Sequence, residues 1–197
     1  RLATVTADLH FAPTEWSQGN LLREGVDAKT IHVTGNSVID ALNYVSQQAE
    51  PKEIKELLDK LGIASTLSGS RNDKKKLILV TAHRRENFGE PMENIFRALN
   101  KLATRDDVEI VYPVHLNPNV QEPANRVLKD LKHITLLPPL DYLPLVHLMK
   151  HATLILTDSG GIKEEAPAFG IPVLVLRETT ERPEGVDAGT LKLVGTE

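Results

Sequence analysis

Short runs of Val, Ile and Leu alternate with helix-like segments along most of this 197-residue chain. Strands are expected at residues 77–81, 109–114, 134–137, 153–157, 172–176 and 191–194. Continuous apolar strands separated by helices are typical of a parallel sheet that is covered by helices on both faces. The sequence therefore predicts an α/β fold with a Rossmann-like, doubly wound parallel sheet.

Helical spacing of apolar residues fills most of the gaps between these strands. Helices are expected at residues 92–103, 123–131 and 143–150, and, nearer the start of the chain, at 17–24, 38–49 and 51–61. Short strands are expected at residues 9–12 and 31–33. The Ser-, Gly- and Lys-rich stretch 65–76 predicts an exposed loop in which Lys74, Lys75 and Lys76 are solvated.

Composition narrows the class of protein. The formal net charge of −4 argues against general nucleic-acid binding, which needs a basic surface. The chain has no cysteine, which fits a reducing cytoplasm and excludes disulfides and thiolate metal sites. No apolar run approaches the ~18 residues of a membrane span, and no signal peptide is visible, so we expect a cytoplasmic protein without a membrane partner.

Polar loops follow five of the predicted strands. In doubly wound sheets, ligands bind at the carboxyl ends of the strands, so these loops should converge on one edge. His83 and Arg84 follow the strand at 77–81, and His115 follows the strand at 109–114. His115 could equally be a buried, hydrogen-bonded histidine. His147 and His151 have a spacing that could hold zinc, but no third ligand is evident, and no metal site is expected.

A Ser-Gly-Gly turn at residues 159–161 joins the strand at 153–157 to a short acidic helix. The N–H groups at a helix start suit a phosphate, and glycines allow close approach of a ligand. Glu164 or Glu165 could accept hydrogen bonds from sugar hydroxyls, and Arg177 or Arg182 could hold phosphate oxygens with a bidentate fork. Alone, the turn is equally compatible with a tight strand–helix connection. Together, these features predict a site for a nucleotide or a nucleotide-sugar diphosphate.

Four segments carry a resemblance to a known family: TAHRREN at 81–87, YPVHLNP at 112–118, TDSGGIKEEAP at 157–167 and RETTERPE at 177–184. With them, essentially the whole chain resembles the bacterial, non-hydrolysing UDP-N-acetylglucosamine 2-epimerases. The resemblance implies an isomerase with two Rossmann-like domains in a GT-B arrangement and an active site between them.

The resemblance also implies a reaction. UDP-GlcNAc and UDP-ManNAc are interconverted by loss of the C2 proton and elimination of UDP, followed by re-addition of UDP and return of a proton to the other face. No metal or other cofactor is implied. The expected partners are UDP-GlcNAc, UDP-ManNAc and UDP, the expected assembly of the full-length protein is a homodimer, and the expected pathway makes cell-envelope polysaccharide precursors.

Residue roles follow by position from the same resemblance. His83 matches the family's histidine near the diphosphate and is the predicted catalytic residue. Ser159, Gly160 and Gly161 match the diphosphate loop, and Glu165 matches the carboxylate on the uridine ribose.

Further positions complete the predicted nucleotide site. Arg182 matches a nucleotide-site arginine. Leu140 and Leu145 align with the positions that line the uracil pocket, where other members have a glutamine and a phenylalanine. Arg84 and His115 match residues of an allosteric UDP-GlcNAc site found in some members.

The predicted domain organisation gives residues 1–35 to the end of a first Rossmann-like domain and the crossover, and residues 36–197 to a second, UDP-binding Rossmann-like domain without its closing helices. Both ends of the chain look cut. The family's candidate acid/base carboxylates belong to the first domain, so the isolated chain is expected to be inactive. Two alternatives are a GT-B glycosyltransferase domain, which would need an acceptor, and a non-catalytic UDP-sugar-binding module. The segments 83–87 and 177–183 favour the epimerase.

Overall fold

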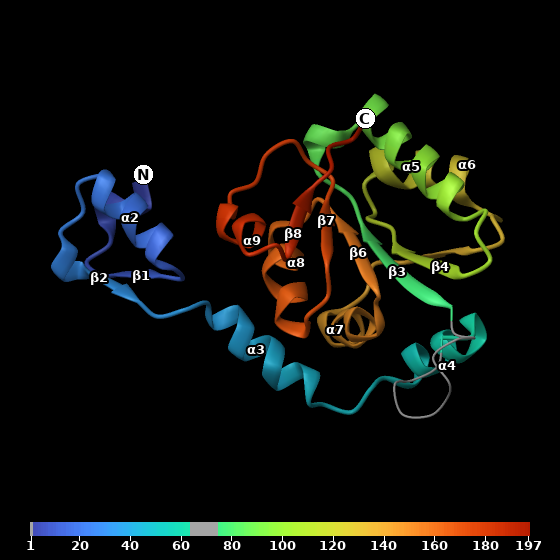
Figure 1. Ribbon diagram of the computed structural model, residues 1–197, viewed down its shortest axis with the longest axis horizontal. Helices are drawn as coiled ribbons and strands as arrows, with labels where there is room; N and C mark the ends of the chain where they lie inside the picture. The colour runs from blue at the N-terminus through green and yellow to red at the C-terminus, as the bar shows by residue number, and fades with distance from the viewer. Residues whose placement is uncertain (1, 64–74) are drawn as a thin grey trace. The chain divides into compact units, whose positions relative to one another are not determined.

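The computed structural model describes residues 2–63 and 75–197. The chain forms two compact units, Arg1–Tyr44 and Val45–Glu197, and the division falls inside helix α3 (Ser37–Ser46). Figure 1 shows the elements of each unit in chain order. The assignment of the first residues to a preceding domain stays a prediction.

The first unit pairs two short parallel strands with short helices. Its elements are α1 (Leu2–Thr6), β1 (His10–Ala12), α2 (Glu15–Arg23), η1 (Ala28–Thr30), β2 (Ile31–Val33) and most of α3. The strands run in parallel with His10 opposite Ile31. Helix α2 begins at Glu15 because the Thr14 side chain accepts a hydrogen bond from the Ser17 amide at 3.1 Å.

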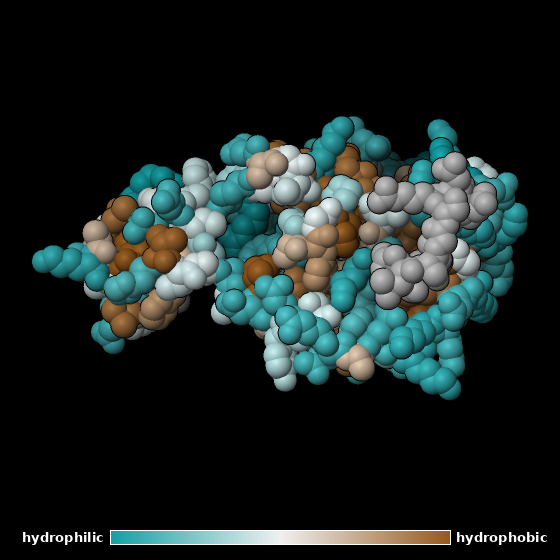
Figure 2. All heavy atoms as spheres, turned by 60° about the horizontal axis from the view of Figure 1, so that its bottom comes forward, coloured by the Kyte–Doolittle hydropathy of each residue, from teal (hydrophilic) through white to brown (hydrophobic). Residues whose placement is uncertain are grey.

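Large hydrophobic side chains lie on the surface of this first unit, which Figure 2 shows as brown areas. The exposed ones include Phe11, Trp16 and Leu22, whereas Ala12, Ile31 and Leu42 are its buried hydrophobic residues among those described. A unit of this size with so few buried side chains has little core of its own.

The second unit is built on a sheet of six parallel strands. Their order across the sheet is β5 (Ile134–Leu137), β4 (Val108–Pro113), β3 (Lys76–Thr81), β6 (Leu154–Thr157), β7 (Val173–Val175) and β8 (Leu191–Leu193). Every neighbouring pair is parallel. The predicted Rossmann-like sheet is confirmed.

Helices cover both faces of this sheet. Helices α5 (Glu90–Leu102) and α6 (Pro118–Leu128) lie on one side, and α7 (Tyr142–His151) lies on the other (Figure 1). The α5 residues that repeat at helical spacing are buried and pack with the strands and α6 in one cluster: Met92, Ile95, Phe96 and Leu99. This packing on two sides explains why the strands have continuous apolar runs.

The remaining helices are short. Helix α4 (Lys52–Leu61) ends at Gly62, whose φ of 70° is the left-handed conformation that glycine adopts easily. After β6 come α8 (Gly160–Glu165) and η3 (Ala166–Phe169), and α9 (Pro183–Asp187) precedes β8. A 3-10 turn, η2 (Arg85–Asn87), lies between β3 and α5.

Most observed boundaries lie within three residues of the predicted ones, and the largest difference is at the start of α6. Helix α6 begins at Pro118, not at residue 123, because the Asn117 side chain accepts from the Asn119 amide at 3.0 Å and Pro118 occupies the first helical turn. Pro123 lies inside the helix. Lys76 begins β3 and is not part of the predicted loop, most of which lies outside the described residues.

The strand order reverses between β3 and β6. From β3 the chain moves outward through β4 to β5, then returns to β6 beside β3 and moves outward the other way. Thr81 and Thr157, the last residues of these two central strands, are register partners. The carboxyl ends of strands at such a reversal form the crevice in which doubly wound sheets bind ligands.

A candidate nucleotide-binding site at the strand-order reversal

A pocket of about 200 Å³ opens at this reversal point. It is lined by Thr81, His83, Pro113, His115, Pro139, Leu140, Leu145, Ser159 and Ile162. Five of these residues are predicted site residues, and they come from the segments that follow four different strands. The structure thus brings together His83, His115, Leu140, Leu145 and Ser159.

Hydrogen bonds between the loops after β3 and β6 fix the floor of the pocket. The hydroxyl groups of Thr81 and Thr157 lie 2.5 Å apart, and the Thr157 hydroxyl accepts from the Ser159 amide at 2.9 Å. The fully buried Asp158 carboxylate accepts from the backbone amides of His83 and Arg84. Side chains at the ends of two strands therefore hold both loops in place.

The His83 ring lies half-exposed between an acid and a second histidine. It stacks on His115 with the ring centroids 5.3 Å apart, and its Nδ1 lies 3.9 Å from Asp158 Oδ1. Burial lowers the pKa of His83 most strongly, the Asp158 charge raises it, and His115 and Arg84 lower it, with a net pKa below the ordinary value of 6.5. The surroundings of His83 therefore favour the neutral ring more than water does, and the Asp158 charge offsets part of this effect.

Apolar side chains also line this pocket. Leu140 follows β5, Leu145 lies on α7, and Ile162 lies on α8. Together with Pro139 they offer a surface of the kind that packs against a flat ring. The assignment of Leu140 and Leu145 to a uracil stays a prediction.

The first glycine of α8 lies beneath two charged side chains. A methyl group on Gly160 would approach Glu181 Oε1 to 3.1 Å and an Arg84 guanidinium nitrogen to 3.2 Å. A methyl group on Gly161 would have a looser neighbour, Glu165 Oε1 at 3.8 Å. Gly160 is therefore the position where a side chain would disturb the arrangement.

Glu165 ends α8 in a largely buried position. Burial and the neighbouring Glu164 charge raise its pKa, while a hydrogen bond from the Tyr142 hydroxyl lowers it in part. Tyr142 begins α7, so this contact joins α7 to α8. The sequence analysis gave Tyr142 no role.

Arg177 and Arg182 are both engaged with carboxylates. Arg182 Nε lies 2.5 Å from Glu164 Oε1, and its backbone amide donates to the Thr180 hydroxyl at 3.1 Å. Arg177 bonds Glu86 and Glu181 at 2.5 and 2.8 Å. Neither Arg182 nor Gly160, Gly161, Glu165 or Arg84 lines the 200 Å³ pocket itself.

A buried lysine went unnoticed in the sequence. The side chain of Lys163 is fully buried, and its Nζ lies 3.1 Å from Glu181 Oε2 and 3.3 Å from the Thr180 hydroxyl. Lys163 thus fastens the loop after β7 to α8. Lys163 lies on a short helix that also buries Ile162 and Glu165, and this position could have indicated its burial.

Other polar residues have structural partners. Lys75 was predicted to be solvated, but its Nζ lies 2.5 Å from the buried Glu109 carboxylate, so this prediction is wrong. Lys74 lies outside the described residues. His151 Nε2 lies 2.6 Å from Glu50 Oε1, and His147 Nδ1 lies 3.9 Å from the same oxygen. Within residues 2–63 and 75–197, no group of three or more His, Asp or Glu side chains could hold a metal ion.

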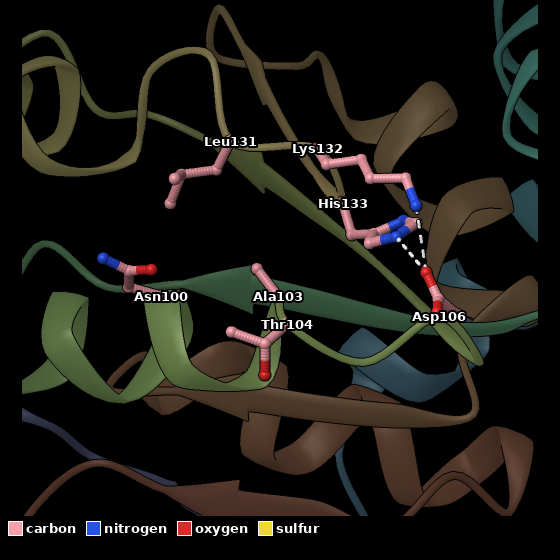
Figure 3. Close-up of a pocket in the computed structure, with 7 residues that line it drawn as sticks. All are labelled: Asn100, Ala103, Thr104, Asp106, Leu131, Lys132 and His133. Carbon is pink, nitrogen blue, oxygen red and sulfur yellow. Dashed lines mark hydrogen bonds and ion pairs between the residues drawn. The ribbon is translucent and has the colours of Figure 1, made fainter.

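A second hollow, of about 280 Å³, lies at the opposite, amino-terminal ends of β4 and β5 (Figure 3). Asp106 there lies 3.0 Å from Lys132 Nζ and 3.2 Å from His133 Nε2. The other ring nitrogen of His133 lies 2.8 Å from Glu109. None of the predicted site residues lines this hollow, and its charged groups are paired with one another.

Comparison with known proteins decides the family. The model of the family described as UDP-N-acetylglucosamine 2-epimerase matches residues 1–197. The chain belongs to this family. It is 56% identical over 201 residues to the UDP-N-acetylglucosamine 2-epimerase of Escherichia coli K12, covering 98% of this chain and 51% of that protein. It is 50% identical over 198 residues to the enzyme of that name from Bacillus subtilis, covering 100% of this chain and 48% of that protein.

Solved structures agree with this assignment. A co-structure of S. aureus MnaA with UDP has 48% identity and a TM-score of 0.88, covering 100% of this chain and 50% of that one. The UDP-GlcNAc 2-epimerase from Neisseria meningitidis bound to UDP-GlcNAc has 47% identity and a TM-score of 0.87, covering 100% and 52%. The chain therefore spans about half the length of the relatives it matches. No helix within the described residues is both long and apolar enough to cross a bilayer.

Proposed function

We propose that this chain forms the UDP-binding half of a UDP-GlcNAc 2-epimerase that interconverts UDP-GlcNAc and UDP-ManNAc. The observation that carries the proposal is the pocket at the reversal of strand order. There His83 and Ser159, from the loops after the two central strands, line the same pocket as the apolar Leu140 and Leu145. Polar and apolar groups together in one small cleft suit a ligand with a charged end and a flat ring.

In this proposal the nucleotide lies across the carboxyl edge of the sheet. The uracil packs against Leu140 and Leu145, and the ribose hydroxyls bind the Glu165 carboxylate. Glu165 is well placed for this because the Tyr142 hydroxyl holds it from α7. The diphosphate lies beside residues 159–161 and His83.

Arg182 is the proposed cation for the nucleotide. Its guanidinium bonds Glu164, the residue before the last one of α8, through Nε. An arginine has five N–H donors, so the remaining donors can bind an anion while this bond persists. The pair with Glu164 then orients the guanidinium toward α8.

The proposed reaction has two halves. A base takes the proton from C2 while the bond from C1 to the diphosphate oxygen breaks with its electron pair, which leaves an unsaturated sugar and UDP. UDP then adds back to C1, and an acid returns a proton to the other face of C2. His83 stabilises the negative charge that grows on the departing UDP.

The lining of the described pocket limits what these residues do themselves. Its titratable members are the two histidines, and it includes no carboxylate among the described residues. We therefore assign proton transfer at C2 to groups outside this pocket. We propose that the full-length protein is a cytoplasmic homodimer that supplies cell-envelope polysaccharide precursors, and that Arg84 and His115 bind a second, regulatory UDP-GlcNAc. The stacking of His115 on His83 would couple such a site to the reaction.

Calorimetric titration of the purified chain tests the nucleotide site. UDP and UDP-GlcNAc should bind, whereas free GlcNAc should give no measurable heat, because the described pocket recognises the nucleotide and not the sugar. Titration with ADP is the matched control for the base. Tight binding of GlcNAc with no response to UDP would refute the proposal.

A further inference from the structure

The carboxylate of Asp158 is fully buried at the end of β6 and collects four hydrogen bonds. The His83 amide donates to both of its oxygens at 3.1 and 2.9 Å, and the Arg84 amide donates at 2.8 Å. The Asn87 side-chain amide donates at 3.0 Å and also bonds the Leu176 carbonyl oxygen at 3.2 Å. One buried acid therefore fixes the backbone on which both His83 and Arg84 stand.

These hydrogen bonds satisfy the side-chain oxygens of Asp158, but they could form to an uncharged side chain as well. Backbone amides bond a neutral carbonyl oxygen as well as a carboxylate, and burying a charge costs more than burying a neutral amide. The negative charge of Asp158 matters for a different reason, which is its attraction to the His83 ring. The Nδ1 atom of His83 is 3.9 Å from Asp158 Oδ1, close enough for direct attraction when the ring is protonated.

We infer that Asp158 is a positioning residue for His83: its buried carboxylate both holds the His83 backbone at the pocket and supplies the negative charge that favours the protonated ring. The inference rests on the proposed function, in which His83 stabilises the negative charge on the departing UDP, a task that the protonated ring performs best. It adds a role for a residue that neither lines the pocket nor touches the ligand.

The other charged groups that face His83 all oppose its protonation. His115 stacks on the ring from the loop after β4, and the Arg84 guanidinium belongs to the same loop as His83. Thr81, at the end of β3, and Ser159, in the loop after β6, also line the pocket and are uncharged. Burial also lowers the pKa of His83, and among the described residues Asp158 is the partner that acts in the other direction.

Removing the Asp158 charge should lower the pKa of His83. When the Asp158 charge is removed, burial, His115 and Arg84 act unopposed, and the pKa of His83 falls further. An opposite charge at this distance shifts a pKa by about one unit or more. Because the His83 ring is partly exposed, we expect the lower end of that range.

The test is an NMR titration of the His83 ring in the purified 197-residue chain. Asp158→Asn keeps the shape of the side chain and removes its charge, and we expect the His83 pKa to drop by about one unit. Asn87→Ala is the matched control, because it loosens the same clamp without changing its charge, and it should shift the His83 pKa much less. An unchanged His83 pKa in a folded Asp158→Asn chain would overturn the inference, as would an equal shift in Asn87→Ala.

A second measurement needs no change at Asp158. In the unaltered chain, the carboxyl carbon signal of Asp158 should show a step at the pH where His83 titrates, and the step should vanish in His83→Gln. Persistence of the step in that variant would refute the coupling. Both readouts are independent of UDP, so they separate this inference from the proposed function, which fails if UDP does not bind.

The pH dependence of UDP binding connects the role of Asp158 with the proposed function of His83. If the protonated ring contacts the diphosphate, UDP affinity should fall as pH rises through the His83 pKa. In Asp158→Asn that fall should occur about one pH unit lower. A fall at the same pH in both chains would contradict the proposed effect on the ligand.

Discussion

Replacing Lys163 tests how the loop after β7 is held against α8. Its side chain is fully buried, whereas the side chain of its partner Glu181 is 48% exposed and also bonded to Arg177. Water and Arg177 therefore remain available to Glu181 when the lysine is removed. Solvent screening limits the Lys163–Glu181 pair to at most about 1 kcal/mol.

The two informative replacements are methionine and alanine. Lys163→Met fills a similar volume with apolar atoms and removes the cost of burying an ammonium, so we expect the free energy of unfolding to change by less than about 1 kcal/mol. Lys163→Ala removes the buried stem and leaves a cavity, which costs about 2–5 kcal/mol when a buried Met or Leu is truncated in this way.

Acid sensitivity gives an independent reading of the same pair. Burial raises the pKa of Glu181, but its own backbone amide, Lys163 and Arg177 together lower it to about 2. Because the pKa is lower in the folded chain, the stabilisation is complete above the ordinary value of 4.5 and is lost as pH falls toward 2. Lys163→Met should lose less stability over this interval than the unaltered chain.

Urea unfolding followed by circular dichroism, at pH 7 and again below pH 4.5, measures both effects. We expect Lys163→Ala to be far more destabilising than Lys163→Met at pH 7. Equal losses of several kcal/mol in the two variants would show that the ion pair, and not the packed stem, holds the loop. In that case the limit of about 1 kcal/mol for the Lys163–Glu181 pair would be wrong.

Three further predictions concern the nucleotide site and its surroundings. Arg182→Ala and Glu165→Ala should each weaken UDP binding by roughly ten- to a hundredfold, measured by calorimetry, because each removes a charged hydrogen-bonding partner worth about 1.5–3 kcal/mol. Lys75→Ala should leave UDP affinity unchanged but lower the free energy of unfolding by about 1 kcal/mol, because the buried Glu109 loses a partner; a larger effect on UDP than that of Arg182→Ala would refute the site. The chain alone should not convert UDP-GlcNAc, and deuterium at C2 in proton NMR in heavy water would contradict this.

Local pattern was enough to predict the second unit's sheet. Runs such as Ile134–Leu137 were predicted with the bounds that the structure has, because a parallel strand covered on both faces must be apolar throughout. The sequence also predicted that the loops after these strands converge on one edge of the sheet, because the carboxyl ends of parallel strands lie there. This is why five predicted residues could be found lining one pocket.

Pairings between distant residues were beyond the sequence. Asp158 lies 75 positions from His83, and only the register of β3 against β6 brings its carboxylate to that amide. The same holds for Lys75, whose partner Glu109 lies on the neighbouring strand β4. Charged residues at strand ends look solvated in a sequence until the neighbouring strand is known.

The predicted start of α6 was wrong for a reason that lies in the neighbouring residues. The sequence predicts Pro123 as the first residue of the helix, but Pro118 is a second proline in this segment that can occupy that place. Asn117 decides between them, because its side-chain oxygen can accept from an amide at the helix start and so caps the helix before Pro118. The capping residue was the better signal.

The central claim is that UDP binds at the reversal of strand order, and backbone amide shifts on UDP addition test it most directly. A two-dimensional NMR spectrum of the chain should show its largest changes at residues 159–161, His83 and Leu145 as UDP is added. Amides around His133, at the opposite end of the sheet, should stay in place. Changes concentrated around His133, or none at saturating UDP, would contradict the account.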